Sequence, residues 1–194
     1  EQKSDYPWDG RIEISFAEAP SHPFALKLRI PGWAEGASLK INGEHSPDAP
    51  TPGSYAEIRR AWQPGDRVEL VLPMKPVFLE ANPVVEHTRN QVAVMRGPVI
   101  YCLESADLPP DIDIDDVLLP ADAKWDVVHK ADLLGGVTIL ETGAIAVAGT
   151  GATPALYRPA RTGKGRTIRI RLIPYYAWCN RGPGDMSVWF PSTR

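Results

Sequence analysis

A short-period alternation of apolar and polar residues, broken by turns, is the feature that most constrains the fold of this chain. Residues 11–16 (RIEISF) place Ile12, Ile14 and Phe16 on one face, and residues 24–30 (FALKLRI) repeat the pattern. Because successive side chains point to opposite faces of a β-strand, this pattern indicates strands with one buried face. The sequence therefore predicts a fold built from strands, with no substantial helical content.

Turn signals separate these strands at short and regular intervals. Asn42-Gly43 follows a predicted strand at residues 38–41, and both central residues of a type I′ hairpin turn require positive φ. A second turn at residues 63–66 (QPGD) precedes a predicted strand at residues 67–72. Twenty Pro and sixteen Gly fit many short strands joined by turns. We interpret this part of the chain as an antiparallel β-sandwich.

The stretch of residues 91–104 (QVAVMRGPVIYCLE) reads as two strands joined at Arg96-Gly97-Pro98. Pro98 has no backbone N–H to donate, so it is expected at a strand start or a sheet edge. Loops are predicted around residues 111–116 (DIDIDD) and in two Gly/Thr-rich stretches, residues 149–153 and 162–165. Further strands are predicted at residues 125–128, 137–141, 144–148, 167–172 and 186–190.

Together these patterns predict an all-β chain of two antiparallel β-sandwich domains in tandem, jelly-roll-like or immunoglobulin-like. The predicted domains are residues 1–79 and 80–194. Prolines at positions 76 and 83 interrupt the strand pattern near this boundary.

Charge and hydropathy exclude several classes of partner. The net charge of −3 gives no electrostatic reason to expect nucleic acid or an anionic membrane. The chain contains no run of about 18 apolar residues, so no membrane-spanning helix is predicted. The first ten residues (EQKSDYPWDG) show no signal-peptide pattern and lead at once into a strand, so we expect a piece of a longer chain. The expected compartment is the bacterial cytoplasm or periplasm.

The acidic loop resembles a calcium-binding loop only in part. Asp111, Asp113 and Asp115 have the alternate spacing of such a loop. The sixth position is Asp116 rather than Gly, and the twelfth is Asp122 rather than Glu. We favour a solvated acidic loop.

The two cysteines, Cys102 and Cys179, are far apart and neither belongs to a CxxC pattern. Cys102 lies in a predicted strand, where a thiol usually packs as a small apolar side chain. A disulfide between the two remains an open alternative at this point.

No other residue set makes an active site from spacing alone. Glu80 and Glu86 are an example of a carboxylate pair that the fold would have to bring within the separation that glycosidases use. The histidines are scattered, without a ligand-spacing partner, and are interpreted as surface or loop residues: His22, His45, His87 and His129.

The aromatic residues allow two interpretations, stacking on sugar rings or packing in the core. Packing is favoured, because a large aromatic side chain buries roughly 150–250 Å². The residues concerned are Trp33, Trp62, Tyr175, Tyr176 and Trp178.

Residues 175–182 are the exception, because their aromatic cluster is followed by Asn180, Arg181 and Gly182, which is polar for a core. We therefore hypothesise a protein interface or a sugar contact in this stretch. Its members would be Tyr175, Tyr176, Trp178 and Arg181.

Several segments, taken in order along the chain, resemble the C-terminal part of glycoside hydrolase family 127, whose members are similar to β-L-arabinofuranosidases. The likeness rests on residues 4–10 (SDYPWDG), 28–43 (LRIPGWAEGASLKING), 55–66, 92–104 and 172–190 (LIPYYAWCNRGPGDMSVWF). The resemblance implies an (α/α)6 barrel followed by two β-sandwich domains.

The resemblance also implies where the family's chemistry lies. Its machinery is a cysteine nucleophile in a zinc site with further cysteines and a glutamate, plus a glutamate acid/base, all in the barrel. Neither Cys102 nor Cys179 stands in such a paired-cysteine context. We therefore expect no catalytic, cofactor-binding or metal-binding residue in this chain, and zinc only in the catalytic domain that it lacks.

Three hypotheses follow. The first is a structural region that supports the catalytic barrel of the same polypeptide and contributes contacts to a homodimer. The second is a carbohydrate-binding module that targets arabinose-containing glycans. The third, an autonomous enzyme, would need a convergent acid/base pair in a cleft.

Overall fold

The computed structural model describes residues 1–147, 157 and 165–193. The chain divides into two compact units, Glu1–Lys75 and Pro76–Arg194. The predicted seam lay between residues 79 and 80, but β8 (Pro76–Glu80) pairs along its whole length with β9 (Gln91–Arg96) of the second unit. The loop predicted at residues 149–153, and most of that at 162–165, lie outside the described residues.

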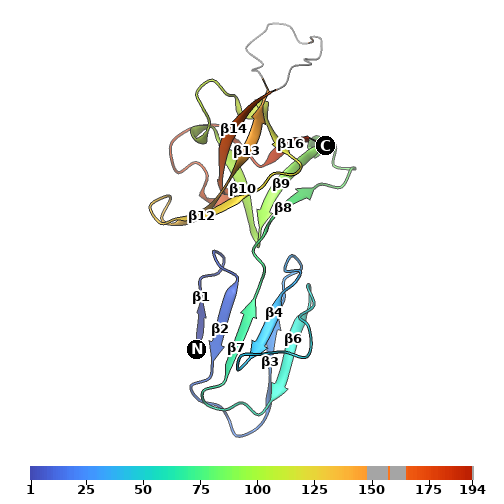
Figure 1. Ribbon diagram of the computed structural model, residues 1–194, viewed down its shortest axis with the longest axis vertical. Coiled ribbons are helices and arrows are strands. Elements are labelled where there is room, and N and C mark those ends of the chain that lie inside the picture. Colours follow the sequence, from blue (N-terminus) through green and yellow to red (C-terminus); the bar gives the residue numbers. More distant parts are fainter. Residues whose placement is uncertain (148–156, 158–164, 194) are drawn as a thin grey trace. The chain divides into compact units, whose positions relative to one another are not determined.

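The first unit consists of two antiparallel sheets (Figure 1). The larger sheet has the order β1 (Gln2–Ser4), β2 (Arg11–Ser15), β7 (Arg67–Val71), β4 (Ser38–Ile41) and β5 (Glu44–His45). The smaller sheet pairs β3 (Phe24–Arg29) with β6 (Tyr55–Arg60).

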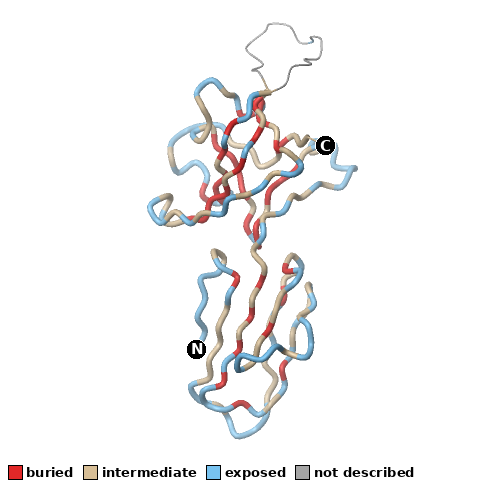
Figure 2. Tube along the Cα trace, in the orientation of Figure 1, coloured by how far each residue is buried: buried red, intermediate tan, exposed pale blue. Residues whose placement is uncertain are grey.

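One apolar core joins these two sheets, as the alternation predicts. Val68 and Leu70 of β7 and Ile58 of β6 are buried in the same cluster, which appears as the buried positions of Figure 2. Trp62 is only 1% exposed and stacks on Phe16 with ring centroids 4.4 Å apart. The packing interpretation of Trp62 is therefore confirmed.

Two turns of the first unit are joined through Asp66. Asn42 has φ 52° and Gly43 has φ 87°, the positive angles expected of this hairpin. Nδ2 of Asn42 donates to Oδ1 of Asp66 over 2.7 Å, and the N–H of Gln63 donates to Oδ2 over 2.8 Å. The Asn42 hydrogen bond, followed by that of Gln63, holds the pKa of Asp66 below its usual value.

The second unit is built from longer strands whose pairings form a closed ring. Its described residues include the short 3₁₀ turns η1 (Glu86–Thr88), η2 (Ser105–Asp107), η3 (Ile114–Asp116) and η4 (Tyr175–Ala177). The ring runs through β9, β10 (Val99–Glu104), β14 (Arg166–Pro174), β13 (Val137–Ala146), β11 (Val117–Pro120) and β16 (Trp189–Thr193), and back to β9. Outside the ring, β8 pairs with β9, β12 (Asp126–Lys130) with β13, and β15 (Met186–Ser187) with β10.

The all-β class is confirmed, but the expected sandwich is replaced by a six-stranded barrel in this unit. The barrel closes because β16 pairs antiparallel with β9 and parallel with β11, while β9 and β10 form a hairpin at Gly97. The two strands predicted at 137–141 and 144–148 are one continuous strand, β13. At its middle, Oγ1 of Thr142 is buried and donates to the carbonyl of Lys124 over 2.8 Å.

Large apolar side chains form the core of the second unit. Figure 2 marks its buried positions in red along the backbone. Side chains at most 1% exposed in this core include Tyr101, Leu103, Leu119, Leu140, Leu172 and Phe190.

No helix in the described part of the chain has the length and hydropathy of a membrane span.

Candidate functional site

Three aromatic residues that the sequence singled out lie at the surface of the second unit. Tyr175, Tyr176 and Trp178 follow the buried Pro174, which ends β14 opposite Tyr101. Their exposed fractions are 44%, 62% and 37%. They are therefore available for contact, and we call residues 175–178 the aromatic segment.

Arg181 is bound inside the unit, close in sequence to this segment. Its Nε donates to Oε2 of Glu104 over 2.9 Å, and its Nη1 donates to Oδ1 of Asp107 over 3.0 Å. The N–H of Cys179 donates to Oε1 of Glu104 over 2.7 Å. Glu104 is only 6% exposed, and buried charges require such pairing and hydrogen bonding. We call Glu104, Asp107 and Arg181 the arginine clasp.

The clasp fixes the charge of Arg181 and the path of its loop. The hydrogen bond that Arg181 donates to Asp107, assisted by the one that it donates to Glu104, raises the pKa of Arg181 against the opposite effect of burial. The guanidinium donates these hydrogen bonds to carboxylates of β10 and η2. The clasp therefore anchors the chain that leaves the aromatic segment.

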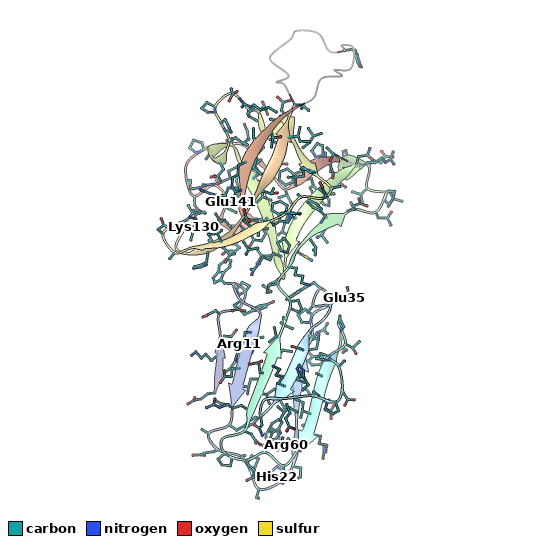
Figure 3. The ribbon with its side chains drawn as sticks, in the orientation of Figure 1. Arg11, His22, Glu35, Arg60, Lys130 and Glu141 are labelled. Atoms are coloured by element: carbon teal, nitrogen blue, oxygen red, sulfur yellow. The ribbon has the colours of Figure 1, made fainter. Side chains whose placement is uncertain are left out.

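A chain of ion pairs continues from the clasp across the sheet. Arg171 lies 3.6 Å from Asp107 and 3.4 Å from Glu141, which Figure 3 labels. Arg169 bridges Glu141 at 3.0 Å and Asp126 at 2.7 Å. The hydrogen bond from Arg169 lowers the pKa of Glu141. These outer pairs are more exposed than the clasp, so each contributes little to stability.

An open groove of about 800 Å³ borders Tyr175. Trp189 of β16 provides a second aromatic wall, and the polar side chains in the lining are Gln91, Asp115 and Ser187. Ile100 and Met186 are among its apolar residues. Strands β9, β10 and β16 of the barrel, strand β15 and the turns η3 and η4 contribute to this groove, so no single sequence segment reveals it.

Neither cysteine belongs to a disulfide or, among the described residues, to a group of metal ligands. Cys102 and Cys179 are both free thiols, so the open alternative of a disulfide is not realised. Burial, followed by the charge of Glu104, raises the pKa of Cys102 to about 12. Among the described residues, no three His, Cys, Asp or Glu side chains converge to hold a metal ion, so these residues do not fit a zinc–thiolate site.

The carboxylates of the acidic loop take part in a turn and in an ion pair. Asp113 accepts the N–H of Asp115 over 3.0 Å, and Asp111 pairs with Arg166 at 3.0 Å. Asp116 is buried, with 2% of its surface exposed, whereas Asp111, Asp113 and Asp115 are exposed. These carboxylates do not form a metal-ligand group among the described residues, and of the four only Asp115 lines the groove.

The remaining sequence candidates are dispersed over the surface. Glu80 ends β8 and Glu86 begins η1, and both are exposed. Trp33 packs against the core of the first unit. The four histidines are all exposed, as interpreted from the sequence: His22, His45, His87 and His129.

Sequence reasoning did not single out Gln91, Ser187 or Trp189. Trp189 precedes the fully buried Phe190, so the alternation along β16 places it on the outer face. That alternation is the one signal that would have pointed to it. The partners across the groove become neighbours only when the barrel closes.

Comparison with known proteins agrees with the division into two units. Residues 1–74 match the family described as Beta-L-arabinofuranosidase, GH127 middle domain. Residues 76–191 match the Glycoside hydrolase family 127 C-terminal domain.

Individual relatives extend this match over nearly the whole chain. The chain is 37% identical over 201 residues to the Non-reducing end beta-L-arabinofuranosidase of Bifidobacterium longum subsp. longum, covering 97% of this chain and 30% of that protein. A crystal structure of a GH127 beta-L-arabinofuranosidase from Geobacillus stearothermophilus T6 superposes with a TM-score of 0.86 at 42% identity, covering 99% of this chain and 30% of that one. A structure described as a glycoside hydrolase gives a TM-score of 0.94 at 42% identity, covering 100% and 32%.

The chain thus spans about a third of the length of these relatives.

Proposed function

Because this chain belongs to glycoside hydrolase family 127, of which it contains the middle and C-terminal domains, we propose that it is the non-catalytic β region of a β-L-arabinofuranosidase-like hydrolase. In this proposal it supports an (α/α)6 catalytic barrel in the same polypeptide. The zinc site that the family resemblance implies would belong to that barrel.

The proposal rests on one observation about coverage. The match takes in 97% of this chain but only 30% of the curated β-L-arabinofuranosidase. The part of the relative outside the match leaves room for a separate catalytic domain.

The chemistry of the described residues supports the same proposal. A cysteine nucleophile needs a lowered pKa, whereas the pKa of Cys102 is raised to about 12 by burial. Carboxylate catalysis needs two groups facing one glycosidic bond. The buried carboxylates Glu104 and Asp107 are instead committed to Arg181.

The aromatic segment is the surface we assign to support of the barrel or to homodimer contacts. Tyr176 and Trp178 expose apolar ring surface, and aromatic side chains are enriched in protein interfaces. Arg181 follows Trp178 by three positions. The arginine clasp would therefore hold this surface in a fixed conformation before docking. A preordered surface lowers the entropy cost of association.

The support role is tested by exchanging Tyr176 and Trp178 for serine together in the full-length polypeptide. We expect an unchanged melting temperature for the isolated 194-residue chain but a lower one for the catalytic domain of the full-length protein, or dissociation of its dimer. Differential scanning calorimetry and sedimentation analysis measure both. Unchanged melting and unchanged oligomeric state would overturn the support role of this surface.

One observation favours a second candidate function, a carbohydrate-binding module. The groove beside Tyr175 combines two aromatic residues with neutral polar side chains.

A further inference from the structure

We propose that the groove between Tyr175 and Trp189 binds a neutral oligosaccharide. The inference deepens the carbohydrate-binding alternative and rests on the proposed function for the class of its ligand. It is carried by the aromatic walls, the polar groups, the charge and the volume of the groove.

The aromatic walls provide faces on which a sugar ring can stack. Tyr175 is 44% exposed at the surface, and Trp189 is half-buried on the outer side of β16. The electron-rich face of an aromatic ring attracts the positively polarised C–H groups on the apolar face of a sugar. Ile100 and Met186 add apolar surface to the same groove.

The polar lining complements sugar hydroxyls, each of which both donates and accepts hydrogen bonds. The amide of Gln91 offers both functions, and the carboxylate of Asp115 accepts. Oγ of Ser187 donates to the carbonyl of Trp189 over 2.7 Å, so its lone pairs remain to accept. This mixture suits a polyhydroxylated ligand better than a purely apolar one.

Charge restricts the ligand further. Among the described residues, the lining contains one carboxylate, Asp115, and no lysine or arginine. A phosphate or a uronic acid would meet repulsion without a compensating cation. The groove therefore favours a neutral sugar over an anionic one.

The volume favours an oligosaccharide over a single sugar. Ligand sites commonly occupy about 300–1,000 Å³, and this groove measures about 800 Å³ and is open to solvent. An open groove of this size accommodates a chain that continues beyond it at either end.

Two features of the fold hold the groove in a binding-ready form. Leu103 and Glu104 of β10 pair with Ser187 and Met186 of β15, so this ladder fixes one wall. Glu104 is also bound by Arg181, which ties the loop after the aromatic segment to the same strand. Such preorganisation reduces the ordering cost of binding.

The test titrates the ¹⁵N-labelled 194-residue chain with linear arabino-oligosaccharides and, as an anionic comparison, with oligogalacturonates. We expect saturable shifts at residues of the groove with the arabino-oligosaccharides and none with the oligogalacturonates. Tyr175→Ala should weaken binding by about tenfold, as loss of one stacking contact does. Trp189→Leu should do the same while keeping an apolar side chain on β16. Tyr55→Ala, an exposed tyrosine of the first unit, is the matched control and should bind normally.

Melting temperatures of each variant separate lost binding from lost folding. Saturation without the expected loss in Tyr175→Ala would overturn the proposal, as would absence of any sugar-dependent shift. Self-association of the chain that Tyr175→Ala abolishes would show instead that the groove is a protein interface. Release of free arabinose, measured in the same samples, reports on the non-catalytic role separately, because binding and cleavage are independent readouts.

Discussion

Nη1 of Arg181 lies 3.0 Å from Oδ1 of Asp107, a residue 74 positions earlier in the chain. This pair and the neighbouring bond to Glu104 close a loop over the end of β10. Both carboxylates are less than 10% exposed, and the arginine side chain is 20% exposed. The aromatic segment and one wall of the groove therefore depend on a buried ion cluster.

Replacing the arginine of this clasp is expected to destabilise the second unit. Arg181→Met removes the arginine that pairs with two buried carboxylates, of which Asp107 keeps only its longer contact with Arg171. Breaking a buried pair in this way costs about 3 kcal/mol. Arg169→Met is the matched control, because its side chain is 60% exposed and surface pairs contribute about 1 kcal/mol or less. Urea unfolding measures both. Equal losses in the two variants would contradict the structural role of the clasp.

The two thiols are expected to differ in reactivity. Burial raises the pKa of Cys102 to about 12, so almost no thiolate exists near pH 8, and the side chain is inaccessible. Cys179 is exposed. Iodoacetamide at pH 8 should add one label to the native chain and two in urea, as read by mass spectrometry. Two labels on the native chain would be inconsistent with the packing of Cys102.

Asp66 is expected to make the stability of the first unit depend on pH. Its hydrogen bonds from Asn42 and Gln63 lower its pKa from 3.8, so the carboxylate stabilises the fold at neutral pH. That contribution is present above the unfolded-state pKa and is lost as the pH falls through the lower folded-state pKa.

Asp66→Asn should therefore melt below the unchanged chain at pH 7, and the difference should shrink at pH 2. Melting curves followed by circular dichroism at both pH values give the comparison. A difference of the same size at both pH values would mean that the charge of Asp66 is not what stabilises the two turns.

Gly10 is expected to tolerate no side chain. A Cβ at this position would lie 1.8 Å from the carbonyl oxygen of Leu72, whose N–H donates to the carbonyl of Gly10. Gly10→Ala should therefore destabilise the first unit by about 1–3 kcal/mol. Gly32→Ala is the control, because nothing lies within 4 Å of its Cβ position, and chemical unfolding should show a change within about 0.5 kcal/mol. A small effect at Gly10 would show that β2 and β7 can separate at this end.

Local patterns predicted the strands well where one face is buried. The hairpin of β9 and β10 was predicted from residues 91–104, and the Asn42-Gly43 turn from its dipeptide. The residues that make up each signal lie close together along the chain. Such short-range features depend on backbone preference and side-chain alternation, which a sequence displays directly.

Closure of the barrel and assembly of the groove were not predictable in the same way. They depend on the pairing of β16 with β9 and with β11, between strands far apart in the chain. The partner of Arg181 was equally unpredictable. The sequence shows only a polar residue after an aromatic cluster, and Glu104 lies beside it only in the folded chain. Pairings over such distances leave no periodic signal in either segment.

The hydrolysis of an aryl β-L-arabinofuranoside tests the central claim most directly. The purified 194-residue chain and the full-length polypeptide are compared at equal molar concentration, with zinc supplied to both. The account predicts product from the full-length polypeptide and none above background from the 194-residue chain. Hydrolysis by the chain alone, removed by Cys102→Ser or Cys179→Ser, would contradict it.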